Sequence, residues 1–143
     1  MTYSFQITVD SSQPHELADW WAETLEWEVE PSDEAFISSM VEQGYASEAD
    51  TMRHNGTLVW KAGSGILPPG EASTAERILF QYVSEPKTVK NRMHLDLRVG
   101  PENHARIRAA LEARGATFVH DGAQGPYSWV TMQDPQGNEF CLT

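Results

Sequence analysis

Polar side chains that could bind or transform a small molecule alternate with apolar ones in two short segments of the sequence. In the segment 93–99, leucines alternate with His94 and Asp96, and further on Glu139 and Cys141 alternate with apolar residues. Such alternation is typical of a strand with one face in the core and the other face open. An imidazole titrates near neutral pH and binds metals, so His94 is the residue best suited to anchor a ligand or to move a proton.

Each of these residues also has a simpler interpretation, and the sequence leaves the choice open. An imidazole on a strand often serves only as a hydrogen-bonded residue of a core or a pocket. Cys141 can be a small buried side chain without chemistry. Trp129 and Trp60 lie in predicted strands, where an indole either packs in the core or offers a stacking surface for a flat or cationic ligand. The sequence does not determine which way these two indoles face.

The elements that would position these residues follow a regular order in the second half of the chain. After the strand at 93–99, the sequence Gly-Pro-Glu opens a helix, and Gly115 stands where a glycine commonly ends one. Three strands follow, at 116–120, 128–133 and 139–142. Between the last two strands, the sequence Asp-Pro-Gln-Gly-Asn at 134–138 predicts a tight turn.

The first half of the chain repeats this order. An alternating strand at 5–10 precedes a helix that begins near Pro14, and Leu17, Trp20 and Trp21 share one face of that helix. A short strand is predicted at 27–30 and two more at 58–62 and 78–83, and the glycine- and proline-rich segment between these two reads as a loop. Each half therefore predicts one strand, one helix and three strands, which is a repeat of architecture rather than of residue identity.

Residues 31–55 interrupt the order in the first half. Phe36, Ile37, Met40 and Val41 predict a short amphipathic helix that starts near Ser32, and a polar stretch follows it. This insertion could form a lid over a binding site, a contact between two copies of the chain, or a surface element against the sheet edge. The sequence does not choose among these roles.

The composition excludes several classes of partner. The 143 residues include 21 acidic and 10 basic ones, a net charge of −11, and no basic stripe that would indicate a nucleic-acid partner. No apolar run is long enough to cross a bilayer. The single cysteine and the absence of an export signal at the start of the sequence favour a cytoplasmic protein.

The repeated order of elements resembles the vicinal oxygen chelate superfamily of glyoxalases, bleomycin-resistance proteins and extradiol dioxygenases. The strand His-Leu-Asp-Leu and the closing sequence from Asp134 to Phe140, similar to the DPxGN signature of that superfamily, carry the resemblance. It implies an α+β fold and a single glyoxalase-like domain over residues 1–143. In that domain two βαβββ modules, at about 3–84 and 92–143, form a curved mixed-sheet cup with the helices outside.

The resemblance also implies an inner cup face that touches a ligand, with these residues in contact: Gln6, Gln81, His94, Asp96, Trp129, Glu139 and Cys141. Metal-dependent members of the superfamily carry His or Gln, then Glu, His and Glu at four inner positions, and the corresponding residues here are Gln6, Gln81, His94 and Cys141. Because both carboxylates are missing, our leading expectation is a site without a metal, with His94 as the catalytic or anchoring residue. Zinc bound by these four residues, with Glu139 nearby, is the alternative.

The resemblance leaves three functions open. The leading hypothesis is a protein that binds a small molecule in the cup, either as an enzyme that moves a proton with His94 or as a binder without chemistry. The second is a metal-dependent lyase, isomerase or dioxygenase. The third is sequestration of an antibiotic of the bleomycin type. The resemblance implies a homodimer as well.

Overall fold

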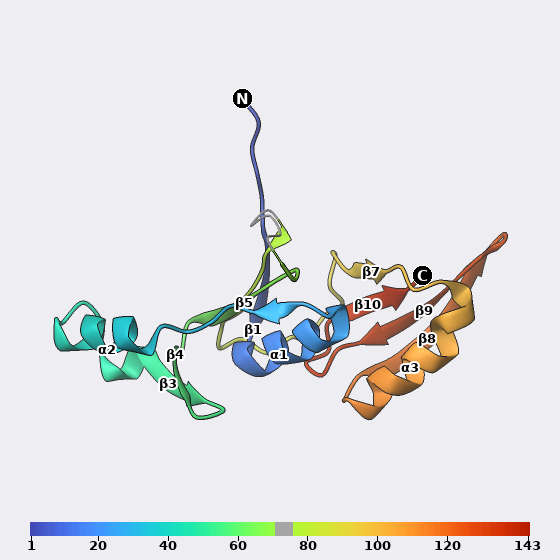
Figure 1. The fold of residues 1–143 in the computed structure, drawn as a ribbon. Coiled ribbons are helices and arrows are strands. Elements are labelled where there is room, and N and C mark those ends of the chain that lie inside the picture. Colours follow the sequence, from blue (N-terminus) through green and yellow to red (C-terminus); the bar gives the residue numbers. More distant parts are fainter. Residues whose placement is uncertain (71–75) are drawn as a thin grey trace. The chain divides into compact units, whose positions relative to one another are not determined.

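The computed structural model of the chain describes residues 1–70 and 76–143 (Figure 1). The chain divides into two compact units, Met1–Pro86 and Lys87–Thr143. Each unit contains one four-stranded mixed sheet and a helix on that sheet. The predicted α+β class is therefore confirmed. No helix in the two described ranges combines the length and the apolar character that a membrane span requires.

The first unit forms its sheet from the strands β1 (Ile7–Ser11), β2 (Glu28–Val29), β5 (Gly63–Leu67) and β6 (Ile78–Tyr82). Their order across the sheet is β1-β6-β5-β2, with β1 parallel to β6 and the other neighbours antiparallel. The first strand of the unit thus lies beside its last strand. Such a parallel pair requires a crossover connection, which here includes the helix α1.

The helix α1 (Pro14–Leu25) covers one face of this sheet and contacts β5 and β6. Leu17, Trp20 and Trp21 are buried on the helix, as their spacing predicts, and Ile66 and Phe80 are buried on the strands. Alternation along the strands turns Thr8, Asp10 and Leu79 to the opposite face of the sheet. The helix and the apolar face together make the core of the first unit.

The inserted segment consists of a helix and a separate hairpin between β2 and β5. It contains α2 (Glu34–Glu42), the short 3₁₀-helix η1 (Glu48–Asp50), β3 (Thr51–His54) and β4 (Thr57–Trp60). The helix predicted near Ser32 is confirmed as α2, which buries Ile37 and contacts β4. Among the residues that the structure describes, β4 pairs with β3 alone, so the insertion reaches Trp60, beyond the predicted limit at residue 55.

Two sequence predictions in this region are wrong. The predicted strand at 58–62 belongs to the inserted hairpin rather than to the main sheet, and Gly63–Leu67, predicted as part of a loop, is the strand β5 of that sheet. Two glycines and a serine among its five residues gave β5 low strand propensity, but pairing with β6 and β2 on both sides overrides it. The part of the predicted loop at 71–75 lies outside the described residues.

Two histidines fasten the inserted hairpin to α1. The ring nitrogen Nε2 of His54 lies 2.6 Å from Oδ2 of Asp19, and Nε2 of His15 donates a hydrogen bond of 2.8 Å to the backbone oxygen of Trp60. The two imidazole rings lie 5.2 Å apart, centroid to centroid. His15 is buried, so this hydrogen bond is largely shielded from solvent on the helix side.

The second unit repeats the topology of the first. Its strands are β7 (Leu95–Leu97), β8 (Thr117–Gln124), β9 (Tyr127–Gln133) and β10 (Glu139–Leu142), and their order is β7-β10-β9-β8. The strand β7 runs parallel to β10, as β1 does to β6. Each unit thus has one strand, one helix and three further strands in its main sheet, as predicted, although β5 takes the place of the predicted strand at 58–62 in the first unit.

A short 3₁₀-helix, η3 (Pro101–Asn103), leads into α3 (His104–Ala113), which lies along β8 and β9 (Figure 1). Leu111 is buried on α3, and Met132 and Phe140 are fully buried on the strands. These two strand residues are register partners, so they occupy the same face of the sheet. The next residues along the strands, Thr131 and Cys141, therefore belong to the opposite, open face.

Candidate functional site

A pocket of about 380 Å³ lies on the open face of the second sheet. All of its lining residues belong to the second unit, and they come from all four strands and the segments beside them: Lys90, His94, Asp96, His120, Trp129, Thr131, Glu139, Cys141 and Thr143. Volumes of this order are typical of small-molecule sites in proteins. The pocket is therefore the candidate functional site of the described structure.

The pocket contains a hydrogen-bonded pair suited to proton transfer, His94 and Asp96. Residue 94 directly precedes β7 and residue 96 lies within it, so both side chains point to the same face. Nδ1 of His94 lies 3.0 Å from Oδ1 of Asp96, and both side chains are partly exposed, at 38% and 53%. The carboxylate accepts the Nδ1 proton, so a neutral ring keeps its lone pair on Nε2. His94 can therefore accept a proton or bind a metal through Nε2.

The thiol of Cys141 joins this pair. In the register of the sheet, Cys141 lies between Asp96 on β7 and Thr131 on β9. Its sulfur is 3.5 Å from the hydroxyl of Thr131. One potential metal-binding atom each from His94, Asp96 and Cys141 lies within 4.8 Å of the others. Nitrogen, oxygen and sulfur donors thus gather at one place on the open face.

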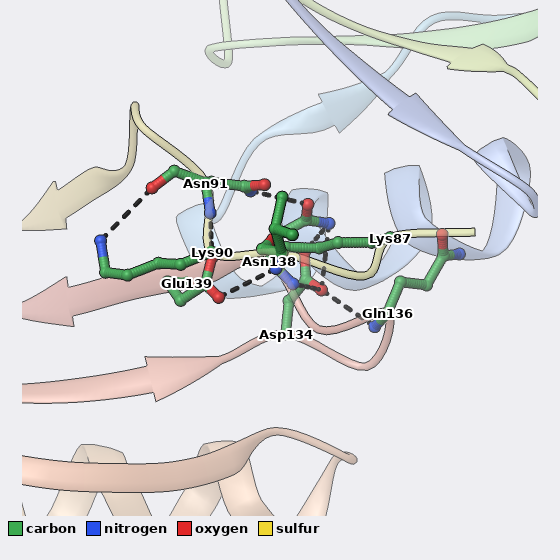
Figure 2. A network of polar contacts seen from close by, with 8 residues as sticks. Lys87, Lys90, Asn91, Asp134, Gln136, Asn138 and Glu139 are labelled. Atoms are coloured by element: carbon green, nitrogen blue, oxygen red, sulfur yellow. Dashed lines mark hydrogen bonds and ion pairs between the residues drawn. The ribbon is translucent and has the colours of Figure 1, made fainter. Parts of the chain in front are cut away.

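The turn at 134–138 holds the segment that leads to His94. Oδ1 of Asp134 accepts hydrogen bonds from the backbone amides of Gln136 and Asn138, and the side-chain amide of Asn138 donates to both carboxylate oxygens. The side-chain oxygen of Asn138 in turn accepts a bond of 2.9 Å from the side chain of Asn91. Figure 2 shows this network, which joins the turn before β10 to the residues just before β7.

Glu139 extends the same network, and both of its carboxylate oxygens accept hydrogen bonds within it. Its Oε1 accepts a hydrogen bond of 2.9 Å from Nζ of Lys87, and its Oε2 accepts one of 2.9 Å from the backbone amide of Asn91 (Figure 2). Burial by itself would raise the pKa of this carboxyl. The hydrogen bonds from Lys87 and Asn91 outweigh burial and lower the pKa from 4.5 to about 2. Glu139 lines the pocket, but both of its oxygens already have partners.

The structure adds pocket residues that the sequence reasoning did not find, above all His120. Phe118 pairs with Met132, whereas His120 pairs with Thr131, so Val119 is an extra residue in a β-bulge of β8. Simple alternation would place residues 118 and 120 on the same face. The bulge instead places His120 beside Thr131 on the open face. Strand pairing carries this information, and the sequence of β8 alone does not.

Two of the expected site residues, Gln6 and Gln81, belong to the first unit and do not come together there. Asp10 pairs with Gln81, so the two glutamines are four positions apart, roughly 13 Å at about 3.3 Å per residue. Gln6 instead accepts a hydrogen bond of 3.1 Å from Arg77. By register, the place that Cys141 has in the second sheet belongs to Leu79 in the first.

The donor set of a metal site therefore differs from the one that the family pattern implied. The structure does not bring Gln6 and Gln81 to one site, and it adds the carboxylate of Asp96 to His94 and Cys141. This set supplies the anionic ligand whose absence had argued against a metal. Imidazole, thiolate and carboxylate together suit zinc better than they suit calcium or magnesium.

Comparisons with known proteins agree with this fold. A family model described as a glyoxalase-like domain matches residues 6–143. A search of curated proteins finds no match. The comparisons thus give a fold family and assign no reaction to this chain.

Solved structures share the fold at low sequence identity. One is a member of the glyoxalase/bleomycin resistance protein/dioxygenase superfamily from Sphaerobacter thermophilus, with a TM-score of 0.56, 16% identity, and coverage of 99% of this chain and 96% of that one. Another is a mutant of the fosfomycin resistance protein FosX from Listeria monocytogenes, complexed with Mn(II) and 1S,2S-dihydroxypropylphosphonic acid. It has a TM-score of 0.62, 10% identity, and coverage of 99% and 91%.

Proposed function

We propose that this chain, which belongs to the glyoxalase-like domain family, binds a small organic molecule in the pocket of its second unit. The observation that carries the proposal is the His94–Asp96 pair, which lines a pocket of about 380 Å³. The pocket combines an apolar wall with a few polar anchors, which is the usual composition of a small-molecule site.

His94 is the anchor in this proposal. Its Nε2 accepts a hydrogen bond from the ligand when the ring is neutral and donates one when the ring is protonated. The Asp96 carboxylate fixes the ring orientation through Nδ1. The same arrangement would let His94 take a proton from a bound ligand, so the site can serve a binder or a proton-transfer enzyme.

The test is a fragment screen of the full chain by amide correlation spectra. We expect fragments that bind to shift amides around residues 94–96, 129–131 and 139–141 together. His94→Ala should weaken their binding by about tenfold, which is the value of one hydrogen bond near 1.4 kcal/mol. Ser128→Ala, an exposed change on β9 whose side chain does not line the pocket, is the matched control. Fragments that never shift these amides, or that bind equally well without the imidazole, would refute the proposal.

A second candidate function is a metal-dependent reaction at His94, Asp96 and Cys141. The three clustered donors favour it, and the neighbour FosX is complexed with Mn(II). Donor atoms around tetrahedral zinc lie about 3.3–3.6 Å apart, so these partly exposed side chains need only small rotations to close on an ion. A bound zinc ion would polarise an oxygen of the ligand.

Metal analysis separates the two candidates. After incubation with Zn²⁺ and removal of the excess, the metal-dependent candidate predicts one ion per chain, lost in His94→Ala. Substitution with Co²⁺ should give a thiolate charge-transfer absorption that Cys141→Ser abolishes. If the wild-type chain retains no zinc ion, the metal-dependent function is refuted and the small-molecule site is unaffected.

A further inference from the structure

Two irregularities of β8 shape one wall of the pocket. One is the bulge at Val119, which turns His120 to the open face opposite Thr131. The other is Gly122, which pairs directly with Trp129 on β9. In the described sheet, β8 is an edge strand. A bulge in an edge strand can have no role beyond discouraging pairing with another chain. Here, however, each irregularity also places a side chain in the pocket.

Gly122 leaves the space that the indole of Trp129 fills. A Cβ atom at position 122 would overlap the ring atoms Cε2, Nε1 and Cζ2 of Trp129, at nearly equal distances from all three. This pattern places the face of the ring, rather than its edge, over the glycine. The backbone angle φ of Gly122 is not positive, so the chain does not need glycine at this position for conformational reasons. The indole is therefore the structural reason for Gly122.

The second face of the indole is directed away from β8. Since Trp129 lines the pocket, this face forms part of the pocket wall. An aromatic face held flat on a strand is a stacking surface for another planar ring. A larger residue at position 122 would push the indole into the pocket and remove that surface.

The charges around this wall favour one kind of ring. Asp96 is paired with His94, and Glu139 with Lys87. Within the described residues, Lys90 and His120 line the pocket without any carboxylate partner. Besides Nε2 of His94, the nitrogen groups open to a ligand are thus an ammonium and an imidazole, both of which can donate to an acidic oxygen.

We propose that Gly122 and the bulge at Val119 make the β8–β9 hairpin a recognition wall for a planar aromatic ring that carries a carboxylate or phenolate oxygen. The ring stacks on Trp129, and its oxygen receives hydrogen bonds from His120 and Lys90. Gly122 is a positioning residue that acts through Trp129. This inference rests on the proposed small-molecule site and adds the class of its ligand.

The test compares two acids of similar size on the full chain. We expect 2-naphthoate to bind about tenfold more tightly than its saturated analogue decahydro-2-naphthoate, because only the aromatic ring stacks on the indole. Binding is followed by amide shifts around residues 120–131. The cationic probe 2-naphthylmethyl-trimethylammonium should bind more weakly than 2-naphthoate, and His120→Ala should reduce that difference.

A double-mutant cycle identifies the part played by Gly122. We expect Gly122→Ala to displace the indole and so to remove the preference for the aromatic acid, with the two acids then bound equally. Trp129→Leu should do the same, and the double variant should lose no more than Trp129→Leu alone, because one residue acts through the other. Ser128→Ala should keep the full preference.

The outcomes also separate this inference from the proposal on which it rests. Equal binding of the two acids, additive effects in the cycle, or stronger binding of the cationic probe would overturn the ligand class. His94-dependent binding of non-planar fragments would still support the small-molecule site in that case. The absence of any pocket binding, by these probes or by the fragment screen, would refute both.

Discussion

The two sheets of this protein share one topology but use their open faces differently. In the first sheet, a Cβ at Gly65 would overlap the paired side chains of Glu30 and Arg77, so an ion pair fills the space above that glycine. In the second sheet, the indole of Trp129 fills the space above Gly122. A salt bridge therefore covers the glycine of the first sheet. In the second sheet, an aromatic ring covers the glycine and keeps its other face toward a pocket.

The difference continues at positions that correspond by strand register. Gln6 in the first unit corresponds to His94 in the second, and each residue directly precedes the first strand of its sheet. Leu79 corresponds to Cys141. The backbone pairing is common to both units, so chemistry at these positions depends on side chains that the topology does not specify.

The largest expected contrast lies between the two ion pairs. Glu139 is 9% exposed and its pKa is lowered to about 2, so its charged form stabilises the folded state. We expect Glu139→Gln to reduce the free energy of unfolding at pH 7 by about 2–3 kcal/mol, measured by urea denaturation. Glu30→Gln, at a pair whose side chains are 33% and 26% exposed, should cost less than about 1 kcal/mol.

The pH dependence gives a second test of the same contrast. The pKa of Glu139 is lower in the folded state than the ordinary value of 4.5, so its stabilisation is complete above that pH and is lost as the pH falls toward about 2. The difference between wild type and Glu139→Gln should shrink over this range. Equal costs for the two substitutions at pH 7 would contradict the comparison.

The sequence was sufficient for the helices α1, α2 and α3 and for the turn before β10, because their signals are local. The buried face of α1 follows from the spacing of Leu17, Trp20 and Trp21, and the turn before β10 follows from its five residues. Such patterns need no knowledge of the strand on the other side of the sheet. The repeat could then be predicted by comparing the two halves.

Strand pairing accounts for what the sequence did not predict. The glycines of β5 are typical of a loop, and only its pairing with the two neighbouring strands makes this segment a strand. His120 could not be assigned to the pocket because the bulge at Val119 changes the alternation of β8. Gln81 lies four positions from Gln6 because of the register between β1 and β6, which no local pattern specifies.

A smaller effect is expected where the insertion meets α1. His15 is 7% exposed, and its Nε2 donates to the backbone oxygen of Trp60 at 2.8 Å. His15→Leu would leave that part-buried oxygen without this donor, and we expect a loss of about 1–2 kcal/mol in urea denaturation. Amides of β3 and β4 should exchange faster with solvent, because the hairpin loses its buried link to the helix.

The more exposed histidine of the same junction is the control. The side chain of His54 is 19% exposed and pairs with Asp19, which is 41% exposed. His54→Leu should therefore cost less than about 1 kcal/mol. A larger loss for this variant than for His15→Leu would mean that the exposed pair, rather than the buried hydrogen bond, fastens the hairpin.

The smallest effect, and the one of opposite sign, is expected at a histidine of the second unit. Nε2 of His104 at the start of α3 is buried and has no hydrogen-bond partner among the residues that the structure describes. A buried polar atom without a partner costs free energy, whereas an apolar group of similar size does not. We expect His104→Leu to raise the free energy of unfolding by roughly 0.5–1 kcal/mol in the same assay.

The identical substitution at His15 should lower it, so the pair of variants compares a satisfied imidazole in one unit with an unsatisfied one in the other. A loss of stability in His104→Leu would show that Nε2 has a partner in solution, and the contrast between the two histidines would then disappear.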